Sequence, residues 1–89
     1  MNSNTDKKNK KIYRTSDIYF AAFLGSVGFP LITTEKEKSP SGHNKVIFLF
    51  TIQDSDQARL KALYFGGSGT VKARVFVDNL RSLKSICFT

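Results

Sequence analysis

The feature that most constrains the fold is the uninterrupted apolar run Lys45–Ile52, which reads KVIFLFTI. After its first residue it consists of β-branched, aromatic and leucine side chains, and the β-branched and aromatic ones favour an extended backbone. A run of this kind, without polar alternation, indicates a strand whose two faces are both at least partly covered. We therefore expect this segment to be the scaffold around which the other elements are arranged.

Length and composition limit the chain to one small folded domain. It has 89 residues, of which 40% are hydrophobic and 12% aromatic, a composition typical of folded chains. Cys87 is the only cysteine, so neither an internal disulfide nor a Cys-based metal site is expected, and a cytoplasmic setting is favoured. No apolar run approaches the roughly 18 residues that a membrane helix needs, and the N-terminus lacks the apolar segment of a secretory signal.

The N-terminal residues differ in composition from the rest. Residues 1–11 contain no apolar side chain after Met1, so they cannot contribute to a core. We expect residues 1–11 to form a mobile basic tail and residues 12–89 to form a single α+β domain.

A first helix is predicted over Ile18–Val27, opened by the polar stretch Arg14–Asp17, with Thr15 or Ser16 as its cap. The small residues Ala22 and Gly25 allow another element to approach the helix closely. Its side chains are apolar or aromatic almost all round, which predicts burial on most sides. A second copy of the chain is one candidate for covering it.

The segment Leu31–Glu37 is predicted to pair with the central run as a β-hairpin, across the polar turn Lys38–Asn44. Its charges alternate toward the end, as they do in exposed edge strands. A two-stranded hairpin is marginal alone, so either three helices cover one face of it or hairpins from two chains pair edge to edge. The second option predicts a homodimer.

Two helices are predicted in the C-terminal half, one over Gln57–Phe65 with Asp54 or Ser55 as cap and one over about Val71–Ile86 with Thr70 as cap. The beginning of the second also alternates as a strand would, but its apolar spacing continues with the helical period. The predicted order is therefore α-β-β-α-α, an α+β fold with a hairpin packed against helices.

The glycine-rich stretch Gly66–Gly69, followed by Thr70 and Lys72, resembles a phosphate cradle, but it lacks the spacing of a nucleotide-binding loop. The helix–turn–helix interpretation of residues 57–85 is weakened by the long, glycine-rich turn. No pair of acids stands beside His43, Cys87 or a candidate nucleophile in a catalytic pattern. We predict no catalytic site, no metal site, no cofactor and no enzymatic activity.

The charge distribution carries the main functional indication. The formal net charge is +7, and the basic residues gather toward the two ends of the chain. Such ends favour a polyanion, most often DNA or RNA, bound through phosphates without sequence specificity. The side chains expected to make these contacts are Lys7, Lys8, Lys10, Lys11, Arg14, Lys72, Arg74, Arg81 and Lys84. The competing explanation is that the charge serves solubility.

Four motifs extend over most of the chain: YRTSD at Tyr13–Asp17, GFPL at Gly28–Leu31, VIFLF at Val46–Phe50 and LRSLKS at Leu80–Ser85. Together they resemble a small bacterial and phage domain family of unassigned function. The resemblance implies a helix–hairpin–helix–helix pattern and a phage or mobile-element setting in a bacterial host. It transfers no catalytic or binding residue.

The sequence leaves two candidate functions open. The first is a small nucleic-acid-binding or replication-accessory protein that uses the last helix and the basic tail, or basic arm. The alternative is a protein-interaction or assembly module that homodimerises through the hairpin edge or the aromatic first helix.

Overall fold

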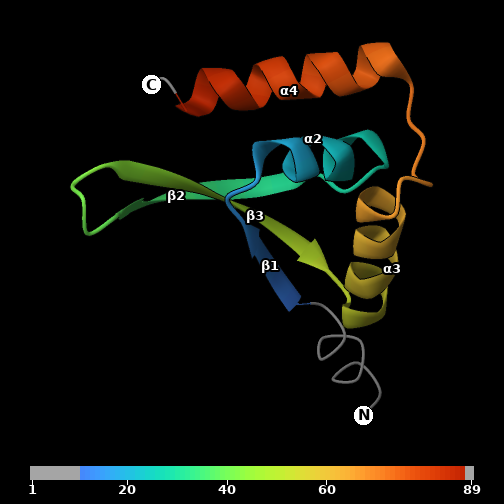
Figure 1. Cartoon of the computed structure of the whole chain (residues 1–89), viewed down its shortest axis with the longest axis horizontal. Helices are drawn as coiled ribbons and strands as arrows, with labels where there is room; N and C mark the ends of the chain where they lie inside the picture. The colour runs from blue at the N-terminus through green and yellow to red at the C-terminus, as the bar shows by residue number, and fades with distance from the viewer. Residues whose placement is uncertain (1–10, 88–89) are drawn as a thin grey trace.

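The computed structural model describes residues 11–87, which form a three-stranded antiparallel sheet and three helices (Figure 1). The elements, in chain order, are β1 (Lys11–Thr15), α2 (Ile18–Ser26), β2 (Leu31–Lys38), β3 (Asn44–Ile52), α3 (Asp54–Phe65) and α4 (Ala73–Cys87). The α+β class and the succession of helix, hairpin and two helices are confirmed. The first strand is an addition to the predicted order.

The apolar run is the middle strand of the sheet, as its composition indicated. The strand order is β1-β3-β2, and both neighbours run antiparallel to β3. The strand β2 pairs with β3 from Asn44 to Phe50, with an irregularity between Leu31 and Thr33, whereas β1 pairs only with the last five residues of β3. The hairpin prediction is therefore confirmed, and β3 gains a second neighbour.

The strand β1 lies where the sequence predicted tail and helix start. Lys11, assigned to the tail, is its first residue and pairs with Ile52, while Arg14 and Thr15 pair with Leu49 and Phe48. Residues 1–10 of the predicted tail lie outside the described residues. Pairing with a strand more than thirty positions away in the sequence stabilises β1. The local amino-acid pattern of residues 11–15 does not indicate such a distant partner.

The cap of α2 is Asp17, not Thr15 or Ser16. Asp17 has an extended backbone, and its Oδ1 accepts hydrogen bonds from the backbone N–H groups of Tyr19 and Phe20 at 3.0 and 3.1 Å. Thr15 Oγ1 instead accepts the N–H of Asp17 at 3.1 Å. The predicted caps were wrong by one or two positions because the chain stays extended through Asp17.

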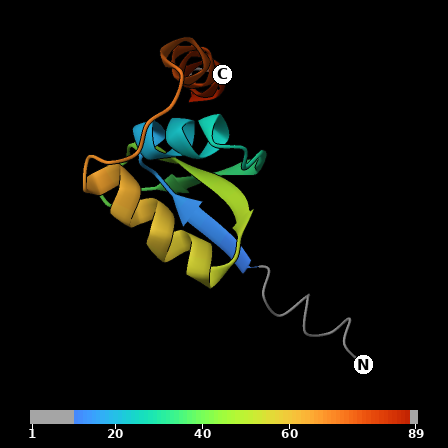
Figure 2. The same ribbon diagram turned by 90° about the vertical axis from the view of Figure 1, so that its right-hand side faces the viewer.

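The helix α2 is enclosed by the chain itself. It lies between the sheet on one side and α4 on the other (Figures 1 and 2), and its residues 20–24 are at most 3% exposed. A Cβ on Gly25 would stand 2.9 Å from Asn79 Oδ1 of α4, so the close approach predicted from small residues is confirmed. Burial of this helix requires no second copy of the chain.

The last two helices differ from their predicted starts. The helix α3 begins at Asp54 after Gln53, whose side chain makes no capping hydrogen bond, so neither Asp54 nor Ser55 is the cap. The segment of α4 is a helix and not a strand, as the sequence favoured, but the helix begins at Ala73. Val71 packs beside the core before the helix starts. Val77 is 41% exposed, so this apolar residue of α4 does not belong to its buried face.

The two faces of β3 have different covers. Phe48, Phe50 and Ile52 lie in the core with residues of the helices, whereas Ile47 and Leu49 alternate to the opposite face, outside that core cluster. Among the described residues no helix covers this second face (Figure 2). Ile47 and Leu49 are nevertheless only 6% and 8% exposed.

Arg14 helps to cover this second face. It lies on β1 opposite Leu49, and its guanidinium reaches across β3 to β2, with nitrogen–oxygen distances of 2.6 Å to Glu35 and 3.2 Å to Glu37. Because Glu35 is opposite Ile47 in the register, this side chain passes over the apolar pair. Its aliphatic stem shields them while its charge stays in solvent.

We expect Arg14→Ala to lower the free energy of unfolding by about 1 kcal/mol, because partly exposed ion pairs contribute little and the rest comes from lost cover over Leu49. Urea titration followed by circular dichroism measures the change. Lys38→Ala removes an exposed cation with no ion pair in residues 11–87 and serves as the control. An equal loss in both variants would show that Arg14 provides no such cover.

Candidate nucleic-acid interface

The N-terminal members of the predicted interface are engaged with acids where the structure describes them. Lys11 Nζ lies 3.0 Å from Asp54 Oδ2, and Arg14 binds Glu35 and Glu37 as above. Their positive charges are thus partly neutralised within the chain. Lys7, Lys8 and Lys10 lie outside the described residues.

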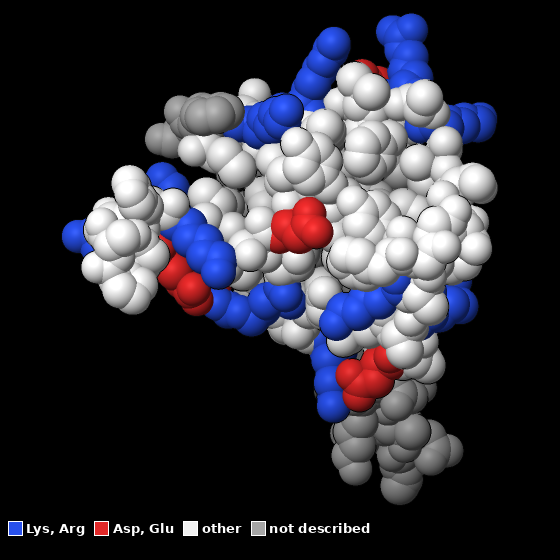
Figure 3. Space-filling view, in the orientation of Figure 1, with Lys and Arg blue, Asp and Glu red and all other residues white. Residues whose placement is uncertain are grey.

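The C-terminal members lie on and just before α4. Lys72, Arg74, Arg81 and Lys84 are all exposed, and within residues 11–87 none of them forms an ion pair. Basic side chains project from the border of the molecule that α4 forms, at the top of Figure 3. These cations are therefore available to a ligand from solvent.

The inner face of α4 explains why its cations point outward. Leu83 is buried, and Phe76 and Leu80 pack against the core cluster that includes α2. On a helix with 3.6 residues per turn, Arg74 and Arg81 then lie on the opposite side, about 10 Å apart along the axis. They share an open hollow of about 370 Å³ with Val77 and Asp78, so one carboxylate stands among the cations.

The structure does not bring the two basic ends together. The strand β1 and the helix α4 lie on opposite sides of α2 (Figures 1 and 2). The described members of the predicted set therefore form two separate groups, one on the sheet and one on α4. The sequence shows where the basic residues are in the chain, but it does not show which of them share a surface.

The glycine-rich stretch is not a phosphate cradle. The N–H of Gly66 donates to the Ala62 carbonyl, and those of Ser68 and Gly69 both donate to the Leu63 carbonyl. These donors thus close the C-terminus of α3 instead of facing a ligand. Gly69 also lies against Phe23, where a Cβ would come within 2.9 Å of the ring.

The helix–turn–helix interpretation also fails on the geometry. The helix α4 packs on α2, not on α3 (Figure 1). A recognition helix of that motif packs on the helix that precedes it. If α4 contacts nucleic acid, it does so from a different scaffold.

An aromatic cluster joins α2 to α3. The ring of Tyr64 lies 5.2 Å from those of Phe20 and Phe23 and 4.9 Å from that of Phe65. Burial, and to a lesser degree the charge of Asp17, raise the pKa of Tyr64 above its ordinary value. The neutral phenol is therefore the form that the fold favours.

This shift predicts a loss of stability in alkali. Because the folded pKa of Tyr64 lies above the unfolded value of 10.0, its contribution is complete below pH 10 and is lost as the pH rises through the folded pKa. We expect Tyr64→Phe to lose less stability between pH 8 and pH 11 than the unchanged chain, measured by urea midpoints. Titration of the lysines affects both proteins equally, so an identical pH dependence would contradict the assignment.

Other kinds of site find no support within residues 11–87. No group of three or more His, Cys, Asp or Glu side chains there is placed to hold a metal ion. His43 is exposed in the turn between β2 and β3. None of the described helices is long and apolar enough to cross a membrane.

Comparison with known proteins gives a family but no relative of known activity. The sequence model of a family described as "Domain of unknown function (DUF5659)" matches residues 10–89. No curated protein matches the chain. No solved structure matches it either.

Proposed function

The chain belongs to the DUF5659 family, a family of domains of unknown function, and we propose that it is a small, non-enzymatic nucleic-acid-binding or replication-accessory protein. It contacts phosphates of DNA or RNA through the outer face of α4, with help from the basic arm that precedes β1. Its setting is the cytoplasm of a bacterial host, as part of a phage or mobile element. The binding is not sequence-specific.

One observation carries this proposal. Lys72, Arg74, Arg81 and Lys84 are exposed on and just before one helix and have no ion pair in the described part of the chain, whereas Lys11 and Arg14 are paired with acids. Only Asp78 opposes them on α4. A surface of this kind attracts a polyanion and releases its counterions on binding.

Titration of labelled DNA at two salt concentrations tests the proposal. With about four phosphate contacts, the affinity for a duplex is expected to fall about a hundredfold between about 50 and 200 mM salt, and somewhat less for a single strand. Fluorescence anisotropy with single- and double-stranded oligonucleotides of the same length measures both. Absence of binding at the lower salt concentration would exclude the proposal.

A second candidate function, the assembly module, has its own supporting observation. The strand β2 is an edge strand of eight residues, and the second face of the sheet exposes Ile12, 55% accessible, with Ile32 at 50% in the irregular part of β2. An unpaired edge and exposed apolar residues are typical of association sites. The first helix is less suited, because α4 covers it and only Tyr19 and Val27 are strongly exposed.

The charges of β2 limit how such a dimer can form. Two copies of β2 that pair antiparallel about a two-fold axis at Lys36 keep the same face upward, so Glu35 opposes Glu37 and Lys36 opposes Lys36. Like charges directly opposite are destabilising. A dimer through this edge would therefore use mainly Leu31–Thr34, and light scattering over a range of concentrations tests it. A monomer at all concentrations would argue against this second function.

A further inference from the structure

The strand β3 has an unpaired edge at its beginning. On one side β2 pairs with it from Asn44 onward, but on the other side β1 reaches only Phe48. Successive residues of a strand direct their N–H and C=O groups to alternate sides. Two of the four residues 44–47 therefore direct these groups away from β2, and no hydrogen bond to them is found within residues 11–87.

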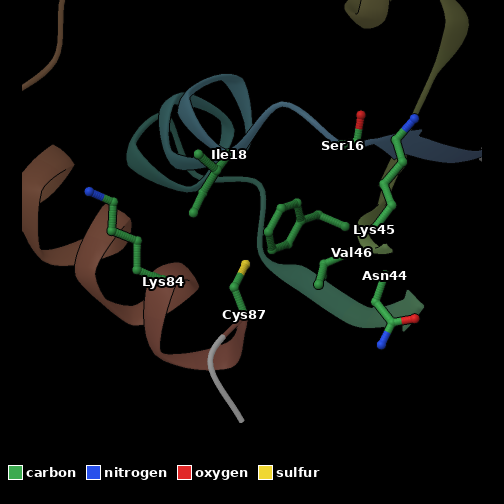
Figure 4. Close-up of a pocket in the computed structure, with 8 residues that line it drawn as sticks. Ser16, Ile18, Asn44, Lys45, Val46, Lys84 and Cys87 are labelled. Carbon is green, nitrogen blue, oxygen red and sulfur yellow. The ribbon is translucent and has the colours of Figure 1, made fainter. Parts of the chain in front are cut away.

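A pocket lies beside this edge. Its volume is about 460 Å³, within the range of ligand sites. Ile18, Val46, Phe48 and Cys87 supply its apolar lining, and the remaining lining residues are Ser16, Asn44, Lys45 and Lys84. The thiol of Cys87 points toward the space between Ile18 and Val46 (Figure 4).

Positive charge flanks the pocket. Lys45 of β3 and Lys84 of α4 stand on opposite sides of it, with their amino groups directed away from its centre (Figure 4), and no carboxylate among the described residues lines it. Neither lysine has an ion pair in the part of the chain that the structure describes. An occupant that carries negative charge is therefore favoured over a neutral or cationic one.

We propose that this pocket binds a short extended peptide segment, with alternating acidic and apolar side chains, as an added strand of the sheet in line with β1. The unpaired groups of Asn44–Ile47 give the main-chain hydrogen bonds, as in other cases of strand addition. Apolar side chains of the peptide enter the space lined by Val46 and Phe48. Its acidic side chains alternate to the face of Lys45, because Lys45 and Val46 lie on opposite faces of β3.

This inference does not depend on the nucleic-acid proposal. The peptide would lie at the sheet end of the pocket, whereas Arg74 and Arg81 do not line it. Lys84 is common to both surfaces, so Lys45 is the informative residue. Arg74→Glu is expected to weaken DNA binding and leave peptide binding unchanged.

Cys87 provides the test, because it is the only cysteine in the chain and it lines the pocket. The probe is the synthetic hexapeptide Glu-Val-Glu-Phe-Glu-Val. The control for charge is the hexapeptide Lys-Val-Lys-Phe-Lys-Val. We expect the acidic peptide to slow alkylation of Cys87 by iodoacetamide at least fivefold at saturation. It should also shift the backbone amide NMR signals of residues 44–47, and Lys45→Glu should weaken its binding about fivefold.

Three results would overturn the proposal. The first is that millimolar concentrations of the acidic peptide change neither the alkylation rate of Cys87 nor the amide NMR signals of residues 44–47. The second is equal binding of the lysine peptide, which would remove the charge argument. The third is protection of Cys87 by decanoate but not by the acidic peptide, which would assign the pocket to a small amphipathic anion.

Discussion

Replacing Phe48 by alanine is expected to remove most of the free energy of unfolding of the domain at 25 °C. Phe48 is 1% exposed, lies in the middle strand and belongs to the core cluster between sheet and helices. Truncation of a buried phenylalanine costs about 3–5 kcal/mol. A domain of this size has a total stability near the lower end of about 5–15 kcal/mol. Far-UV circular dichroism with urea titration measures the loss.

Phe65 provides the matched control for this substitution. Its ring contacts those of Phe20 and Tyr64 at 5.6 and 4.9 Å, but the residue is 66% exposed. We expect Phe65→Ala to cost about 1 kcal/mol, the value of an aromatic contact without much burial. Similar losses in the two variants would mean that aromatic contacts, and not burial against β3, hold the domain together.

The parts of the fold that the sequence predicted correctly depend on local patterns. The run Lys45–Ile52 is β-branched and aromatic, the turn before it is rich in turn-forming residues, and the last helix repeats its apolar positions with the helical period. Each of these signals lies within one segment. The structure accordingly keeps the hairpin of β2 and β3 and the helix α4.

The strand β1 could not be predicted in the same way. It has five residues, of which only Ile12 and Tyr13 are apolar. Its extended conformation is stabilised by pairing with a distant part of the chain. The packing of α4 on α2 is also a long-range choice. Ala22 and Gly25 indicated that some element approaches α2 closely, but not which one.

The candidate interface shows the same limit. The basic residues can be identified in the sequence, but the acids with which they form ion pairs cannot. Arg14 meets Glu35 and Glu37 only because β1 and β2 flank the same strand in a particular register. The unpaired edge at Asn44–Ile47 likewise follows from the short length of β1, which the sequence did not predict.

The double substitution Arg74→Glu, Arg81→Glu is expected to abolish most nucleic-acid binding without unfolding the domain. Both side chains are exposed on the outer face of α4, so the core is untouched. Loss of two phosphate contacts lowers the slope of log affinity against log salt by about two, and the affinity at low salt falls at least tenfold. Anisotropy titrations of a labelled duplex at several salt concentrations measure both quantities.

The pair Lys36→Glu, Lys38→Glu separates a binding surface from a general effect of charge. It changes the net charge by the same amount, but on the edge strand β2 instead of α4. If α4 is the interface, this control keeps the salt slope of the unchanged protein and loses only a small part of its affinity through long-range electrostatics. Equal losses in both double variants would mean that overall charge attracts the polyanion and that no face of the domain is specialised for it.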